Sequence, residues 1–166
     1  MPYDCGIVVV KHPDAHRGAM AVRAAYLEHA EHAERDALEY VPEFSRRGRA
    51  GPVHAVLRHL GRRGIAALVE RCCAHAARFA EILSREPGIA ILNDVVLNQV
   101  LVRFGDDDAH TREVIARVQQ DGTCWLGGTT WHGLAAMRIS VSNWSTGDDD
   151  VRRSAEAIVA AHRARS

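Results

Sequence analysis

The chain has 166 residues, 47% of them hydrophobic and 25% charged, which argues against wholesale disorder and predicts one domain or one domain plus a further piece. Lys and Arg total 21, as do Asp and Glu, so the zero net charge gives no indication of a nucleic-acid or membrane partner. No apolar run could cross a bilayer, and the start MPYDCG lacks signal-peptide character, so we expect a cytoplasmic protein with reduced thiols.

The first 61 residues read as an incomplete α/β region. Cys5–Lys11 (CGIVVVK) is a β-branched run that predicts a buried strand, as in a parallel sheet. A helix is expected from Pro13 to about Val22, then a long connection over about 24–44. After a break at Gly51–Pro52, another helix is expected to about Leu60. One strand and two helices cannot bury a sheet face, so residues 1–61 are interpreted as the tail of a larger domain.

Residues 62–166 have the pattern of a compact α+β domain with a small, mainly antiparallel sheet. A hinge is expected at Gly61–Gly64, and Trp125 and Trp131 are expected in the core, with the glycine pair at 127–128 in a tight turn or a close packing contact. The expected helices are Ile65–Arg85, Thr111–Gln120 and one opening at Asp148; the expected strands are Ile89–Leu92, Gln99–Phe104, Thr123–Leu126 and Ala136–Val141.

Arg138 is the first candidate site residue. In the stretch AAMRISVSNW it alternates with Met137 and Ile139, so it should lie on the opposite face of its strand, beside two serine hydroxyls. A guanidinium held on a strand can bind a carboxylate through two parallel hydrogen bonds. The alternative is an arginine that is solvated or paired for structural reasons.

Two further candidates lie in the first 61 residues. Tyr26, in AAYLEH, could donate a proton, because a phenol is protonated at neutral pH; it could equally pack its ring against the protein. Ser45, followed by two arginines and a helix start, could bind a phosphate, or the basic run could be a solvated surface. The sets His29–His32 and Cys72–His75 lack metal-site spacing, so no metal is expected.

Seven stretches together resemble the group II pyridoxal-phosphate-dependent amino-acid decarboxylases, the family of aromatic-L-amino-acid and glutamate decarboxylases. They occur in family order and cover nearly the whole chain: PYDCGIVVV, AAYL, SRRGRAGPVHAVLRHLG, ERCCAHAARFAEIL, LNDVVLNQVLVRF, DGTCWLGGTTWHG and AAMRISVSNWSTGDDDV. The resemblance implies an aspartate-aminotransferase-like α/β fold (fold type I), the cofactor pyridoxal 5'-phosphate, an amino-acid substrate and a homodimer.

The resemblance also implies roles for single residues. Tyr26 matches the tyrosine of the mobile catalytic loop, Arg138 matches an arginine that binds the substrate carboxylate, and Ser45 matches a residue near the cofactor phosphate. Residues 1–61 then correspond to the end of the cofactor-binding large domain, with the loop at about 24–44, and residues 62–166 to the C-terminal small domain.

The cofactor lysine of the family is expected to lie about four residues before Met1. Lys11 is the only lysine of the chain, and it lies at the far end of the first expected strand. The sequence therefore predicts the C-terminal part of a decarboxylase that is inactive alone. Two alternatives stay open: a non-catalytic interaction module, or one half of a split enzyme that assembles with a cofactor-binding partner.

Overall fold

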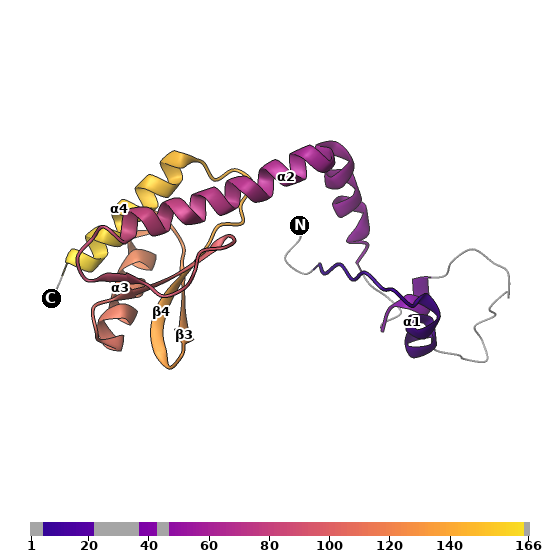
Figure 1. The fold of residues 1–166 in the computed structure, drawn as a ribbon, viewed down its shortest axis with the longest axis horizontal. Coiled ribbons are helices and arrows are strands. Elements are labelled where there is room, and N and C mark those ends of the chain that lie inside the picture. The colour runs from indigo at the N-terminus through magenta and orange to yellow at the C-terminus, as the bar shows by residue number, and fades with distance from the viewer. Residues whose placement is uncertain (1–4, 22–36, 43–46, 165–166) are drawn as a thin grey trace. The chain divides into compact units, whose positions relative to one another are not determined.

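The computed structural model describes residues 5–21, 37–42 and 47–164, which divide into two compact units (Figure 1). We call Met1–Gly61 the N-unit and Arg62–Ser166 the C-unit. Tyr26, Ser45 and most of the expected loop lie outside the described residues. No helix in the described ranges is long and apolar enough to span a membrane.

The N-unit contains short helices. These are α1 (Pro13–Met20), the 3-10 helix η1 (Ala37–Tyr40) and the beginning of α2 (Ala50–Leu83). Proline suits the first turn of α1, where its missing N–H would have no intrahelical acceptor. The Arg17 guanidinium donates a hydrogen bond of 2.5 Å to the Glu39 carboxylate, which joins α1 to η1.

The segment Cys5–Lys11 differs from the expected buried strand. It is neither helix nor strand, and Val8 and Val9 are 80% and 94% exposed. A strand needs the backbone of a neighbouring strand to complete its hydrogen bonds. The described residues of the N-unit contain no strand, so this apolar run has no sheet to join.

Helix α2 is interrupted at Gly61, within the expected hinge. The backbone there has φ 61° and ψ −176°, which a glycine tolerates because it has no Cβ. From Arg62 onward the helix belongs to the C-unit and contributes one apolar face to its core. The buried residues of that face are Cys72, His75, Ala76, Phe79 and Leu83.

The C-unit is built on a small antiparallel sheet, as the sequence predicts. Its four strands are ordered β1-β2-β4-β3, with bounds Ile89–Ile91 for β1, Gln99–Phe104 for β2, Gly127–Trp131 for β3 and Leu134–Ser140 for β4. Helix α3 (Asp108–Asp121) connects β2 to β3, and helix α4 (Asp148–Arg163) follows β4. Asp107 caps α3 by accepting hydrogen bonds from two backbone N–H groups, so the helix begins three residues earlier than expected.

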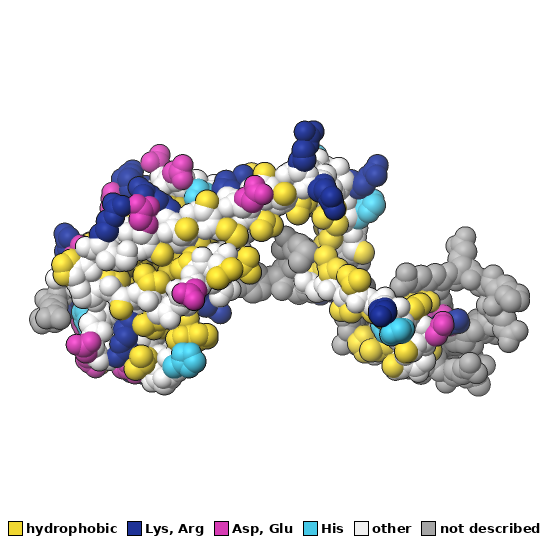
Figure 2. All heavy atoms as spheres, viewed as in Figure 1, with side chains coloured by type: hydrophobic (Ala, Val, Ile, Leu, Met, Phe, Trp, Pro, Cys, Tyr) yellow, Lys and Arg dark blue, Asp and Glu magenta, His cyan; other side chains and the backbone are white. Residues whose placement is uncertain are grey.

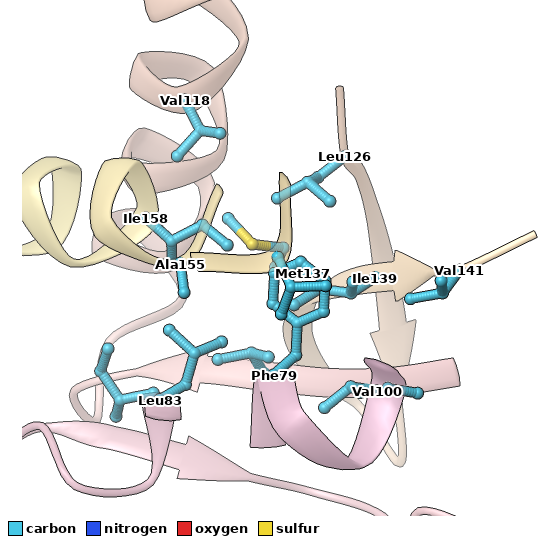
Figure 3. Close-up of a cluster of buried hydrophobic side chains, with 14 of the residues drawn as sticks. Phe79, Leu83, Val100, Val118, Leu126, Met137, Ile139, Val141, Ala155 and Ile158 are labelled. Carbon is cyan, nitrogen blue, oxygen red and sulfur yellow. The ribbon is translucent and has the colours of Figure 1, made fainter. Parts of the chain in front are cut away.

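Helices α2, α3 and α4 supply the apolar side chains that cover one face of this sheet (Figure 3). Every second residue of β2 and β4 points into the resulting core, as the period of a strand requires. Burial of one such large apolar side chain stabilises the fold by about 1.5–3 kcal/mol. Fully buried members include Leu83, Val100, Val102, Phe104, Val114, Val118, Met137, Val151, Ala155 and Ile158.

Two expectations about strand β3 are wrong. The strand covers Gly127–Trp131 rather than Thr123–Leu126, and the glycine pair lies inside it. The turn instead uses His132 and Gly133, with φ of 47° and 82°, as a two-residue hairpin requires. The close-packing alternative is not supported either, because a Cβ at Gly128 would lie 3.5 Å from the Ile115 side chain, an ordinary van der Waals distance, and a Cβ at Gly127 would meet no atom within 4 Å.

The two tryptophans beside the glycine pair also differ from the expected core positions. Trp125 is 79% exposed and Trp131 is 42% exposed. The helices already fill the core with aliphatic residues and Phe79, and Trp125 precedes the first residue of β3. Large apolar side chains therefore remain at the surface, where a further protein surface or a ligand could cover them.

A buried arginine joins three elements of the C-unit. The Arg103 guanidinium on β2 donates to the Asp108 carboxylate at 2.5 Å and to the carbonyl oxygens of Asp106 and Ala135 at 2.8 and 3.2 Å. The same Asp108 oxygen accepts from the backbone N–H of Ala135. These bonds hold the start of α3 against β2 and β4, and they hold the pKa of Asp108 below its ordinary value, chiefly through the arginine.

Candidate functional site

Arg138 lies near the end of β4, on the face of the sheet that the helices leave uncovered. Met137 and Ile139 are 0% and 2% exposed in the core, whereas Arg138 is exposed, which is the expected alternation. Across the sheet it is paired with Leu101 of β2 and Gly127 of β3. The central position of β4 gives its backbone a fixed place between two neighbouring strands.

The neighbours of Arg138 leave space beside the guanidinium. Gly127 has no side chain, and a Cβ built there would meet no atom within 4 Å. Its backbone dihedral is also not one that requires glycine. Packing and conformation therefore do not explain this glycine, and its effect is an open approach to Arg138. Ser140, two residues along the same strand face, adds an exposed hydroxyl.

The two arginines on this face differ in their partners. Arg103 is buried and bonded to Asp108, whereas Arg138 makes no hydrogen bond or ion pair within residues 5–21, 37–42 and 47–164. Elsewhere on the C-unit, positive and negative side chains alternate over α2 and α4 (Figure 2), in pairs such as Arg152 with Glu156 at 2.9 Å. The Arg138 guanidinium is thus available to an outside anion.

An apolar rim surrounds this end of the sheet. Strand β2 begins at Gln99, opposite Ser140, the last residue of β4, and β3 begins opposite Arg138. The residues just before β2 and β3 and just after β4 must therefore lie at the same end. Three of them are largely exposed: Leu97 at 63%, Trp125 at 79% and Trp144 at 76%. A cation and exposed apolar side chains at the same end of a sheet suit a ligand that joins a carboxylate to an apolar part.

Hydrogen bonds hold the loops of this rim in place. The Asn98 side chain donates to the carbonyl of Val141 at 2.9 Å, and the backbone N–H of Val141 donates to the Asn98 carbonyl. After β4, the Arg71 guanidinium of α2 donates to the carbonyl of Trp144 at 3.0 Å. The rim is therefore anchored both to the sheet and to the long helix.

One hollow among the described residues belongs to the N-unit. It is an open groove of about 1050 Å³ beside residues 6–12, lined mostly by apolar side chains. Its polar members are Lys11, His12, His16 and Tyr40. Pyridoxal phosphate requires a lysine, a partner for its ring nitrogen and donors for its phosphate. Among the described residues, the groove offers one lysine but neither a carboxylate nor an arginine, so these residues by themselves do not form a complete site for that cofactor.

The structure thus describes one of the three predicted site residues. Arg138 lies where the strand pattern predicts, and Tyr26 and Ser45 lie outside the described residues. No group of three or more potential metal ligands occurs within the described part of the chain. Sequence reasoning missed the role of Gly127, since only the strand register shows that it neighbours Arg138.

Comparison with known proteins identifies related domains. The profile described as "Pyridoxal-dependent decarboxylase conserved domain" matches residues 1–104. No curated protein sequence matches the chain.

Solved structures of low sequence identity share the fold. Oryza sativa TDC with PLP and tryptamine superimposes with a TM-score of 0.78 at 18% identity, over 88% of this chain and 33% of its own. Mouse CSAD in its apo form gives a TM-score of 0.74 at 12% identity, over 93% and 35%. Catharanthus roseus tryptophan decarboxylase in complex with L-tryptophan gives 0.62 at 19% identity, over 66% and 25%. The chain spans a quarter to about a third of these proteins' length.

Proposed function

Because the chain belongs to the pyridoxal-dependent decarboxylase family, we propose that it provides the C-terminal part of an amino-acid carboxy-lyase that uses pyridoxal 5'-phosphate. The single observation that carries the proposal for the C-unit is Arg138, an exposed cation on a fixed strand with open space beside it. An α-amino acid brings a carboxylate, and a guanidinium binds a carboxylate in a defined orientation. The role of Arg138 is to hold the substrate carboxylate.

Tyr26 and Ser45 complete the set of proposed residues. Tyr26 supplies the proton that replaces the departing carboxylate, since a phenol remains protonated at neutral pH. Ser45 contributes a hydroxyl donor near the cofactor phosphate. Both assignments are supported by the resemblance of the stretches AAYL and SRR to the family, whose profile matches residues 1–104.

The N-unit gives the reason to propose that this polypeptide is inactive by itself. Among the described residues, its groove holds Lys11 without a carboxylate for the ring nitrogen of the cofactor or an arginine for its phosphate. Its apolar segment exposes Ile7, Val8 and Val9 by 61%, 80% and 94%, as expected for a strand whose neighbours come from other polypeptide. We therefore propose that a cofactor-binding part with its own lysine must assemble with these residues, as in a longer enzyme or a split one.

The first experiment is a carbon dioxide release assay on the 166-residue polypeptide with pyridoxal phosphate and a panel of amino acids. We expect no rate above that of the cofactor alone, and activity when the product of the adjoining upstream coding sequence is supplied. Activity of the polypeptide alone would contradict the proposal. Lys11→Arg is the matched variant: if it abolished such activity, Lys11 itself would be the cofactor lysine.

A second candidate function is a non-catalytic interaction module. The observation in its favour is the same exposed run, which could pair with the sheet of another protein. Carbon dioxide release by the complex of this chain with its partner distinguishes the two proposals. A complex that forms but releases no carbon dioxide with any amino acid of the panel would support the interaction module.

We also propose that the assembled enzyme is a cytoplasmic homodimer. All four cysteines are free thiols, which supports a reducing compartment. Sedimentation of the assembled enzyme should give the mass of two copies of each part; a mass of one copy would contradict the dimer.

A further inference from the structure

The part of α2 that precedes the break at Gly61 is a short helix without a core. It covers residues 50–60 and belongs to the N-unit, and the first buried residue of α2 is Cys72, far beyond it. An isolated helix shorter than about 12–15 residues is marginal in water, and helices in proteins are stabilised mainly by the packing of one face. Gly51 lowers the helix propensity of this part further. Residues 50–60 therefore need a surface to pack against.

An apolar stripe runs along this short helix. Successive residues of a helix differ in direction by about 100°, so positions i, i+3, i+4 and i+7 lie on one side. These positions are occupied by Val53, Val56, Leu57 and Leu60, which we call the stripe. The last three are exposed by 47%, 47% and 37%. Figure 2 shows hydrophobic side chains gathered along this part of α2. The stripe is thus an amphipathic face with apolar surface still to bury.

The rest of the surface of this helix is basic. His54, Arg58 and His59 lie away from the stripe, and all three are exposed. The sequence from 44 to 69 contains no aspartate or glutamate, so this helix brings no negative charge of its own. Carboxylates at the border of a partner surface would be attracted to Arg58, whereas a second copy of the helix would bring like charges together. The charge pattern therefore favours an acidic partner over a second copy of this chain.

The composition and spacing of the stripe favour a groove on a protein over a lipid surface. Anchors at i, i+3, i+4 and i+7 are those by which an amphipathic helix fits into the apolar groove of another protein. Helices that lie on a bilayer commonly insert tryptophan or phenylalanine, and residues 50–60 contain neither. Valine and leucine over about two turns suit a narrow groove of roughly 10 Å in length.

The cofactor-binding part of the enzyme is the partner that the proposed function already requires of the N-unit. The same unit exposes the apolar run at Ile7, Val8 and Val9, and the decarboxylase profile matches residues 1–104, which include both this run and the stripe. The chain covers 33% of Oryza sativa TDC and 35% of mouse CSAD, so most of each of those proteins lies outside the part that it covers. A partner of that size offers ample surface for a groove.

We propose that residues 50–60 are a docking helix, whose stripe enters an apolar groove with an acidic border on the cofactor-binding part. The inference rests on the proposed function, since it names the surface through which the two parts assemble. The groove covers the side chains of Val56, Leu57 and Leu60, and carboxylates at its border attract Arg58. The helix ends at Gly61, where the non-helical backbone separates it from the part of α2 that packs in the C-unit.

The test measures how tightly the full 166-residue chain binds the separately purified product of the adjoining upstream coding sequence, by titration calorimetry. Leu57→Gln keeps a good helix former but puts an amide in the groove, and it should weaken binding roughly tenfold or more. Ala55→Gln is the matched control: it introduces the same side chain about 160° around the helix from Leu57 and should bind within about twofold of the unaltered chain. Both positions are exposed, so circular dichroism of the free chain should not change.

The acidic border is tested through Arg58. Arg58→Gln should bind several-fold more weakly at low salt, and its binding should depend less on salt than that of the unaltered chain. Arg153→Gln removes an exposed arginine of the C-unit and leaves the same total charge, so it is the matched control and should bind as the unaltered chain does. Equal salt dependence of the two variants would overturn the acidic border.

The outcomes separate this inference from the proposed function. If the unaltered chain does not bind the upstream product, the proposed function is refuted and the docking helix with it. Binding that Leu57→Gln weakens no more than Ala55→Gln does would overturn the docking helix alone. Two other occupants of the stripe would also overturn it. A dimer of the chain alone that Leu57→Gln dissociates would identify a second copy, and binding to phosphatidylserine vesicles that the same variant loses would identify a lipid surface.

Discussion

The C-unit buries Val100, Val102 and Val114 completely, whereas the N-unit leaves Val8 and Val9 80% and 94% exposed. These side chains have the same chemistry, so the difference lies in what surrounds them. In the C-unit three helices cover one face of a sheet whose backbone bonds are paired. In the N-unit the corresponding apolar run has no strand beside it among the described residues. One unit contains its own core, and the other requires a surface from elsewhere.

The largest expected effect follows from separating the units. A polypeptide of residues 62–166 should unfold cooperatively in urea, because it retains the whole core cluster. A polypeptide of residues 1–61 should show no cooperative transition, since a small set of short helices buries too little apolar surface. Circular dichroism with urea titration measures both. A cooperative transition in residues 1–61 would show that the N-unit also folds by itself, and would contradict this difference between the two units.

A single core substitution should show the same contrast on a smaller scale. Phe79 is 5% exposed and packs in the core cluster, so Phe79→Ala should lower the free energy of unfolding of the C-unit by about 3–5 kcal/mol. Val9→Ala is the control in the N-unit and should change stability by less than about 0.5 kcal/mol. Urea unfolding of the full chain measures both effects. Equal effects would contradict the division into one unit that contains its own core and one that does not.

Acid should weaken the C-unit through Asp108. Its pKa is lowered chiefly by the hydrogen bond from Arg103 and then by the N–H of Ala135. A lowered pKa means that the charged form stabilises the fold above the ordinary pKa of about 3.9, and that this stabilisation is lost as the pH falls through the folded value.

Asp108→Asn should therefore reduce stability at pH 7 and flatten its decline below about pH 4. Asp94→Asn, at an exposed position, is the matched control and should leave the pH profile unchanged. Urea unfolding at a series of pH values measures both. If Asp108→Asn kept the full acid-dependent decline, the bond to Arg103 would not be its source.

The smallest effect on stability is expected at Arg138. Arg138→Gln should change the free energy of unfolding by less than about 0.5 kcal/mol, because the side chain is exposed and bonded to nothing in the described ranges. The same variant should lose the NMR shifts that benzoate induces in the amides of Gly127 and Ser140. Arg153→Gln, which removes an exposed arginine of α4, should retain them. Identical titrations of the two variants would contradict a carboxylate site at Arg138.

The sequence by itself determined the elements whose pattern is local. The bounds of β2 and the apolar faces of α2 and α4 follow from residue spacing, because a helix or strand side chain repeats its direction with a fixed period. The outward direction of Arg138 was predictable for the same reason. So was the family, whose motifs occur in order along the chain.

Tertiary structure decided everything that depends on a distant neighbour. Gly127 and Gly128 lie in a strand because β4 pairs with them, although glycine disfavours strands. Trp125 is exposed because the helices fill the core without it, and Cys5–Lys11 is not a strand because the described N-unit offers it none to pair with. The hydrogen bond between the imidazole rings of His110 and His162 joins residues 52 positions apart, and no local pattern in the sequence marks it. Residue spacing specifies the direction of the side chains along one helix or strand. Strand pairing and the burial of a face also depend on the segment that packs against it.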